Sequence, residues 1–135
     1  MSMFSIFNIS ASAIGAQAQR LNVVASNLAN VDTVAGPDGQ PYKARQLSFQ
    51  AQLMDAEGGT GVTVSTLSES QAPGRRVLDP KNPQADAEGY VTYSNVSAVE
   101  EMTNMISASR SYQNNIEVMN TTKTLLTKTL QMGQG

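Results

Sequence analysis

Apolar and small side chains recur along the first part of the chain at intervals that alternate between three and four residues. This spacing predicts an α-helix over residues 4–30 and is typical of a coiled-coil seam. We expect the seam to be an assembly interface, formed by Phe4, Phe7, Ala11, Ile14, Ala18, Leu21, Ala25 and Leu28. Arg20 is the only charged side chain between Met1 and Val31. Because interface cores are depleted in charge, an intersubunit core is favoured over an ordinary intramolecular helix pair.

Turn-forming residues are concentrated in the middle of the chain, where all five prolines lie between Pro37 and Pro83. The segment 36–39 predicts a turn, because Pro and Gly supply the dihedral angles that a turn needs. Residues 47–53 alternate apolar and polar, which predicts a strand with its apolar side buried. Residues 62–67 predict a second strand, and 75–78 and 90–93 predict shorter extended pieces.

A second helix is expected from Asn95 or Ser97 onward, since Ser97 and Glu100 have the spacing of a capping box. Its apolar positions recur at helical intervals, and we expect them to form a second assembly interface. They are Met102, Met105, Ile106, Tyr112, Ile116, Met119, Leu126 and Leu130. Methionines at this spacing are interpreted as core residues rather than as an adaptable binding groove.

The expected fold is therefore mainly α, with a small β-rich insert. The two long terminal helices are predicted to pair as an antiparallel coiled coil, and short strands and hairpins lie between them. The expected segments are an N-terminal helix over 1–33, a β-rich insert over 34–94 and a C-terminal helix over 95–135. Segments 1–33 and 95–135 are expected to form one helical domain.

Composition narrows the possible functions. The 135 residues carry a net charge of −2, so the overall charge does not favour binding to nucleic acid or to an anionic membrane. The chain has no Cys and no His, so thiolate chemistry, the commonest general base and the commonest transition-metal ligand are missing. We expect no catalytic residue, no cofactor, no metal site and no small-molecule substrate. No apolar run reaches the ~18 residues of a membrane span, and no basic region precedes Met3, so neither a span nor a cleaved signal peptide is expected.

Two polar groups leave alternatives open. Asp79, Asp86 and Glu88 could form a calcium site or a carboxylate pair that cuts a glycan, but solvated loop carboxylates are favoured. Arg75 and Arg76 are interpreted as charges that keep an edge strand from pairing with another chain or as a surface ion pair, or else as a contact to an acidic neighbour.

A short asparagine-rich motif ends the first helix: Asn27, Leu28, Ala29, Asn30, Val31, Asp32 and Thr33. Asn27 and Asn30 could cap the helix C-terminus or hydrogen-bond a neighbouring subunit. Residues 20–33 resemble the N-terminal signature of bacterial flagellar axial proteins, the rod, hook and hook-associated subunits. Residues 36–42, 79–91 and 107–120 narrow the resemblance to the basal-body rod proteins, and among these to the proximal rod.

This resemblance implies a structural subunit that leaves the cytoplasm unprocessed through the flagellar type III export apparatus. It implies helical assembly in the periplasm with copies of itself and with other rod proteins. Such an assembly would be the drive shaft and the wall of the export channel. The alternatives are a soluble coiled-coil adaptor, a needle-like type III assembly subunit, or a carboxylate-dependent cell-wall glycosidase.

Overall fold

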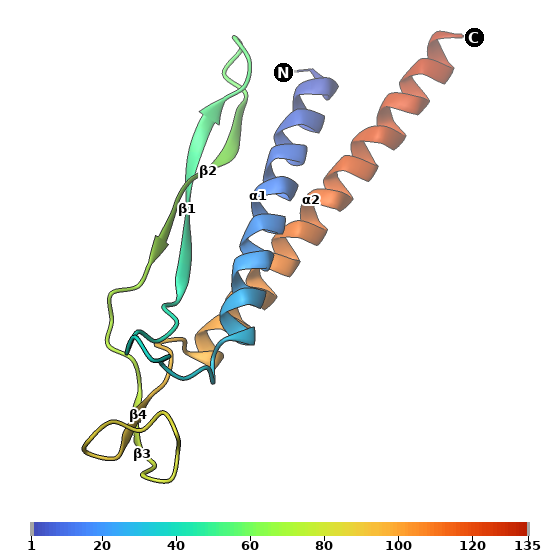
Figure 1. Cartoon of the computed structure of the whole chain (residues 1–135). Helices are drawn as coiled ribbons and strands as arrows, with labels where there is room; N and C mark the ends of the chain where they lie inside the picture. Colours follow the sequence, from blue (N-terminus) through green and yellow to red (C-terminus); the bar gives the residue numbers. More distant parts are fainter. Residues whose placement is uncertain (1, 135) are drawn as a thin grey trace. The chain divides into compact units, whose positions relative to one another are not determined.

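The structure is a computed structural model, and it describes residues 2–134. Two long helices lie at the two ends of the sequence, and the strands of two small sheets lie between them in chain order (Figure 1). In chain order the elements are α1 (Met3–Ala29), β1 (Arg45–Leu53), β2 (Thr60–Glu69), β3 (Arg76–Leu78), β4 (Tyr90–Thr92) and α2 (Ala98–Gly133). The predicted order of helix, β-rich insert and helix is confirmed.

Helix α1 begins with a serine cap. The N–H of Ser5 donates to Oγ of Ser2 at 3.2 Å, which satisfies one of the free amides of the first turn. No acidic residue occupies that turn. The exposed positions of α1 follow one another at three or four residues and carry no charge. They are Phe4, Asn8, Ala11, Gly15, Gln19, Asn22, Ala25 and Ala29.

Helix α2 begins after Ser97, as predicted. The N–H of Glu100 donates to Oγ of Ser97 at 3.4 Å, which is the Ser half of the capping box. The helix contains a series of threonines whose hydroxyls donate to the carbonyl oxygen four residues earlier. These threonines are Thr103, Thr122, Thr124, Thr127 and Thr129, with distances of 2.8–3.0 Å.

Strands β1 and β2 form a hairpin whose connection closes with the Met54 N–H donating to the Gly59 carbonyl at 2.7 Å. The strand predicted over 47–53 is present, but the expectation that its apolar side is buried was wrong. Phe49 is 37% exposed and Leu53 is 68% exposed. Alternation fixes the direction of each side chain, but a two-stranded sheet has no second layer of its own to bury them against.

Strands β3 and β4 form a second antiparallel sheet, in which Val77 pairs with Val91. Val91 is fully buried and an isolated bridge joins Val34 to Tyr93. The turn predicted over 36–39 is confirmed, because the Gly39 N–H donates to the Gly36 carbonyl at 2.9 Å and Gly39 has a φ of 72°.

The chain divides into two compact units. The helix–hairpin unit consists of the described parts of Met1–Leu21, Ser48–Thr66 and Ile106–Gly135. The junction unit consists of Asn22–Leu47 and Leu67–Met105. The segment boundaries at 33 and 94 expected from the sequence stay a prediction.

Candidate functional site

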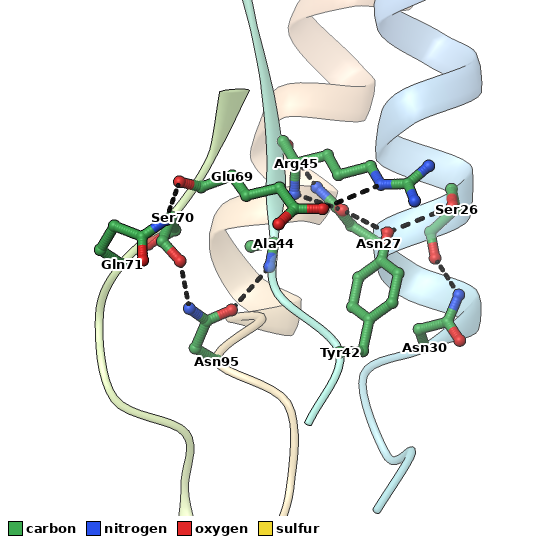
Figure 2. Close-up of polar contacts among 10 residues, drawn as sticks. All are labelled: Ser26, Asn27, Asn30, Tyr42, Ala44, Arg45, Glu69, Ser70, Gln71 and Asn95. Carbon is green, nitrogen blue, oxygen red and sulfur yellow. Dashed lines mark hydrogen bonds and ion pairs between the residues drawn. The ribbon is translucent and has the colours of Figure 1, made fainter. Parts of the chain in front are cut away.

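Asn27, in the last turn of α1, is 1% exposed and forms the centre of a polar cluster in the junction unit (Figure 2). Its Nδ2 donates to the carbonyl oxygen of Arg45 at 2.9 Å, and its Oδ1 accepts the N–H of Arg45 at 2.9 Å. A backbone N–H can only donate, so the Arg45 amide fixes which side-chain atom of Asn27 is the oxygen. One side chain thereby satisfies both backbone groups of the residue that begins β1.

Tyr42 is a second partner of the Asn27 side chain. Its hydroxyl donates to Oδ1 of Asn27 at 2.9 Å and lies 3.2 Å from Oγ of Ser26. The tyrosine has one hydroxyl proton, so Ser26 must be the donor in the second bond. The guanidinium of Arg45 lies 5.9 Å from the centre of the Tyr42 ring and its Nε lies 4.0 Å from Oε1 of Glu69. Both charged side chains are about half exposed, so this pair contributes little to stability.

Asn95, which lies between β4 and α2, binds Ala44, the residue before Arg45. Its Oδ1 accepts the Ala44 N–H at 2.6 Å, and its Nδ2 donates to the carbonyls of Ser70 at 3.1 Å and Ala72 at 2.9 Å. The Ser70 N–H donates to the Ala44 carbonyl at 2.8 Å. Ala44 itself is buried. Two asparagines far apart in sequence therefore hold consecutive residues at the start of the hairpin (Figure 2).

Ser94 joins the segment before α2 to the end of the asparagine motif. Its hydroxyl donates to the Val31 carbonyl at 2.8 Å and its N–H donates to the Thr33 carbonyl at 3.1 Å. Ser94 is buried, so these bonds are protected from water. The motif is thus tied to residues 42–45 through Asn27 and to residue 94 through its last carbonyls.

The two asparagines of the motif have different roles. Nδ2 of Asn30 donates to the Ser26 carbonyl at 2.9 Å, so Asn30 caps the end of α1. Capping was one of the two alternatives that the sequence left open for this residue. The side chain of Asn27 binds Arg45 and Tyr42 within the chain, a role that neither alternative anticipated. Contact of Asn27 with a neighbouring subunit stays a prediction.

Both arginines of the basic doublet form surface ion pairs, which confirms that interpretation. NH2 of Arg76 lies 3.0 Å from Oδ2 of Asp86 and 3.4 Å from Oε2 of Glu88, and its guanidinium lies 4.6 Å from the centre of the Tyr90 ring. The Tyr90 N–H, followed by the N–H of Glu88 and by Arg76, lowers the pKa of Asp86. A general acid needs a raised pKa, so the pKa of Asp86 is shifted in the wrong direction for the general acid of a glycosidase.

Arg75 repeats this arrangement at the end of the motif. Its NH2 lies 3.4 Å from Oδ1 of Asp32 and its guanidinium lies 4.9 Å from the centre of the Tyr93 ring.

Within residues 2–134, no three acidic side chains gather closely enough to hold a metal ion. Neither described helix is long and apolar enough to cross a membrane.

The side chains predicted to form interfaces differ in exposure. On α1, Phe4, Ala11 and Ala25 are exposed, whereas Phe7, Ile14, Ala18, Leu21 and Leu28 are half-buried. On α2, Met102, Met105, Ile106 and Leu130 are exposed, whereas Tyr112, Ile116, Met119 and Leu126 are half-buried. The most buried apolar side chains of the helices are instead Ala16, Val24 and Ala108. The assignment of these residues to intersubunit contacts stays a prediction.

Sequence reasoning missed Tyr42 and Ser94 as partners of the motif, and it missed Asn95 as a partner of Ala44, Ser70 and Ala72. Each lies just outside a helix or strand, where polar side chains find backbone groups that the regular elements leave free. Their position next to a helix or strand indicates that they hydrogen-bond backbone groups, but no local pattern identifies which distant backbone group each of them binds.

Two family models match the chain. Residues 7–37 match the family described as flagella basal body rod protein, and residues 87–132 match the C-terminal family of the flagellar basal body rod FlgEFG proteins. The first match contains the whole asparagine motif, and the second contains Asn95 and nearly all of α2. The chain is thereby placed among the flagellar rod proteins.

Relatives that match over their full length identify the family within the flagellar rod proteins. The flagellar basal-body rod protein FlgC of Salmonella typhimurium is 55% identical over 134 residues, covering 99% of this chain and 100% of that protein. FlgC of Escherichia coli O157:H7 has the same identity and coverage, and FlgC of Bacillus subtilis is 39% identical over 150 residues, also with 99% and 100% coverage. The chain belongs to the FlgC family and is a structural subunit of the flagellar basal-body rod. The resemblance inferred from the sequence is confirmed.

Proposed function

We propose that this subunit builds the proximal rod by assembling helically with copies of itself and with other rod proteins. The assembly is the periplasmic drive shaft and the wall of the export channel. The subunit reaches the periplasm through the flagellar type III export apparatus without a cleaved signal peptide. It has no catalytic activity, cofactor, nucleic-acid partner or small-molecule substrate.

The observation that carries this proposal is the uncharged exposed face of α1. Phe4 is 68% exposed, and Ala11, Gly15 and Ala25 are exposed further along the same face. A helix that meets only water normally carries charged residues on its outer face, whereas the core of an interface is depleted in charge. The small side chains at Ala11, Gly15 and Ala25 let another helix approach closely. We infer that neighbouring subunits cover this face in the rod.

We further propose that the terminal helices pair as an antiparallel coiled coil. On α2 the buried residues Ala108 and Thr122 are separated by two heptads, the repeat that a coiled-coil seam requires. Ile6 of α1 lines one groove together with Val118 and Thr122 of α2, as expected for neighbouring helices.

Deletion of the gene from a motile flagellated bacterium tests the function. We expect hooks, filaments and distal rods to be absent while the membrane ring still forms. Complementation with the wild-type chain should restore all three. Isolated basal bodies that retain complete rods after the deletion would contradict the proposal.

Two controls address the competing functions. A chain carrying both Asp86→Asn and Glu88→Gln should still support rod assembly, whereas a glycosidase that used this pair would lose its activity. Circular dichroism of the dilute wild-type chain separates a self-sufficient adaptor from a rod subunit. The rod subunit should gain helicity on assembly, and the adaptor should be fully helical alone.

A further inference from the structure

The hairpin β1–β2 contacts the N-terminal half of α1 within the helix–hairpin unit. The hydroxyl of Ser12 on α1 donates to the Ile9 carbonyl at 2.7 Å and accepts the N–H of Val62 in β2 at 3.1 Å. Ser12 thus connects the backbone of the helix to the backbone of the strand. The amide of Val62 is satisfied by a helix side chain rather than by another strand.

Gly61 allows this close approach. It is buried, and a Cβ atom at this position would lie 2.6 Å from Oγ of Ser12 and would collide with Sδ of Met54. A side chain here would therefore force either the Met54 side chain and the Ser12 hydroxyl to shift or β2 to move away from the helix, and a shift of the hydroxyl would disturb its bond to Val62. The glycine is needed for contact between two elements, since its φ does not lie in the left-handed region.

A second contact lies at the tip of the hairpin. Oδ1 of Asp55 accepts the N–H groups of Gly59 at 2.6 Å and Glu57 at 3.1 Å, which fixes the carboxylate within the turn. Ser5, in the first turn of α1, lies near this carboxylate and, after the Gly59 N–H, lowers the pKa of Asp55. Since α1 has no acidic residue of its own in that turn, Asp55 supplies the negative charge that a helix N-terminus favours.

We propose that the hairpin is a strap that holds the N-terminal half of α1 in its helical conformation, through the contacts of Gly61 and Val62 with Ser12. The two elements need each other. A two-stranded hairpin is marginally stable alone in water, and an isolated helical segment of this length is marginal as well. Their order is therefore coupled, so that loosening the hairpin loosens residues 3–21.

Amide hydrogen exchange of the full chain, read by mass spectrometry on peptides from 3–21 and 48–66, tests the coupling. Gly61→Ala changes a residue of the strand, and exchange in 3–21 should rise at least about fivefold, as loss of a contact worth one hydrogen bond implies. Gly15→Ala is the matched control, because a Cβ there meets nothing within 4 Å. It should leave exchange unchanged or slow it, since Ala favours the helix.

Ser12→Ala gives the sharper result because the two explanations predict opposite signs. Alanine is the better helix former, so a purely local effect slows exchange in 3–21. Loss of the strap accelerates it and also exposes the Val62 amide. Unchanged or slower exchange in 3–21 in the Ser12→Ala chain would overturn the proposal, and this variant decides the question if Gly61→Ala fails to fold.

Discussion

The side-chain amide of Asn27 binds the N–H and the carbonyl of Arg45 together, at 2.9 Å each, in the way that a neighbouring strand would. A helix side chain thus takes the place of a strand partner at the first residue of β1. The last turn of α1 and the start of the hairpin are thereby held in one fixed alignment within the junction unit. This bidentate contact gives the asparagine of the family motif a physical role.

Replacing Asn27 should destabilise the junction unit. Asn27→Ala leaves both backbone groups of Arg45 without their partner, and an unsatisfied buried group costs about 1–3 kcal/mol. We expect a loss of about 2 kcal/mol in the free energy of unfolding, measured by urea titration. Asn22→Ala is the control, because Asn22 is exposed on the same helix. Equal stability of the two variants would show that the Arg45 contacts contribute nothing.

Asn95→Asp should destabilise the chain although it preserves shape. The aspartate still accepts the Ala44 N–H, but it cannot donate to the carbonyls of Ser70 and Ala72. We expect a loss of about 2 kcal/mol at pH 7 by urea titration. Asn82→Asp is the matched control, since Oδ1 of Asn82 accepts the Gln84 N–H and that acceptor is retained. A control variant as unstable as Asn95→Asp would point to added charge rather than to lost donors.

Asp86 should make stability depend on pH in the acid range. Its pKa is lower in the folded chain than the ordinary value of 3.8, so the unfolded chain takes up the proton first as the pH falls. The stabilisation is present above about pH 4 and disappears as the pH falls through the folded pKa. Wild type should therefore have a higher urea midpoint than Asp86→Asn at pH 7, and the midpoints should converge as the pH falls through the folded pKa of Asp86.

Salt identifies the cause of this dependence. The largest cause is the Tyr90 N–H bond rather than the Arg76 pair. A backbone hydrogen bond is screened far less by salt than an exposed ion pair. The difference between wild type and Asp86→Asn should persist in about 1 M salt. Its disappearance there would assign the effect to Arg76.

A charge on the exposed face of α1 should block assembly without unfolding the subunit. Ala25 is exposed, so Ala25→Glu should fold with the circular dichroism spectrum of the wild type. An unpaired carboxylate buried between subunits costs several kcal/mol, so swimming in soft agar should be lost in a complemented deletion strain. Ala25→Ser, which adds no charge, should swim. Normal swimming of the Ala25→Glu strain at equal protein level would show that water meets this face in the rod.

Helices and their boundaries were predictable because their signals are local. The spacing along α1 and the Ser97 cap of α2 depend on residues a few positions apart, and both were placed within a few residues. The strand at β1 was found in the same way, but the exposure of Phe49 was not. Burial depends on what lies opposite a side chain, which a period of two does not encode.

The junction could not be derived from the sequence because its bonds join distant segments. Asn27 binds residue 45, and Asn95 binds residues 44, 70 and 72. An asparagine carries the same donors and acceptor wherever it lies, so its partner is set by the fold. Family resemblance marked Asn27 as significant, and geometry alone supplied the reason.

The threonines of α2 have a consequence for what can cover this helix. At Thr124, Thr127 and Thr129 the hydroxyl proton is already bound to the carbonyl four residues earlier. These side chains therefore lose no hydrogen bond from their own donor when water is removed from around them. At these three positions α2 can exchange solvent for a packed neighbour at a small desolvation cost, which suits both a free subunit and a subunit built into the rod.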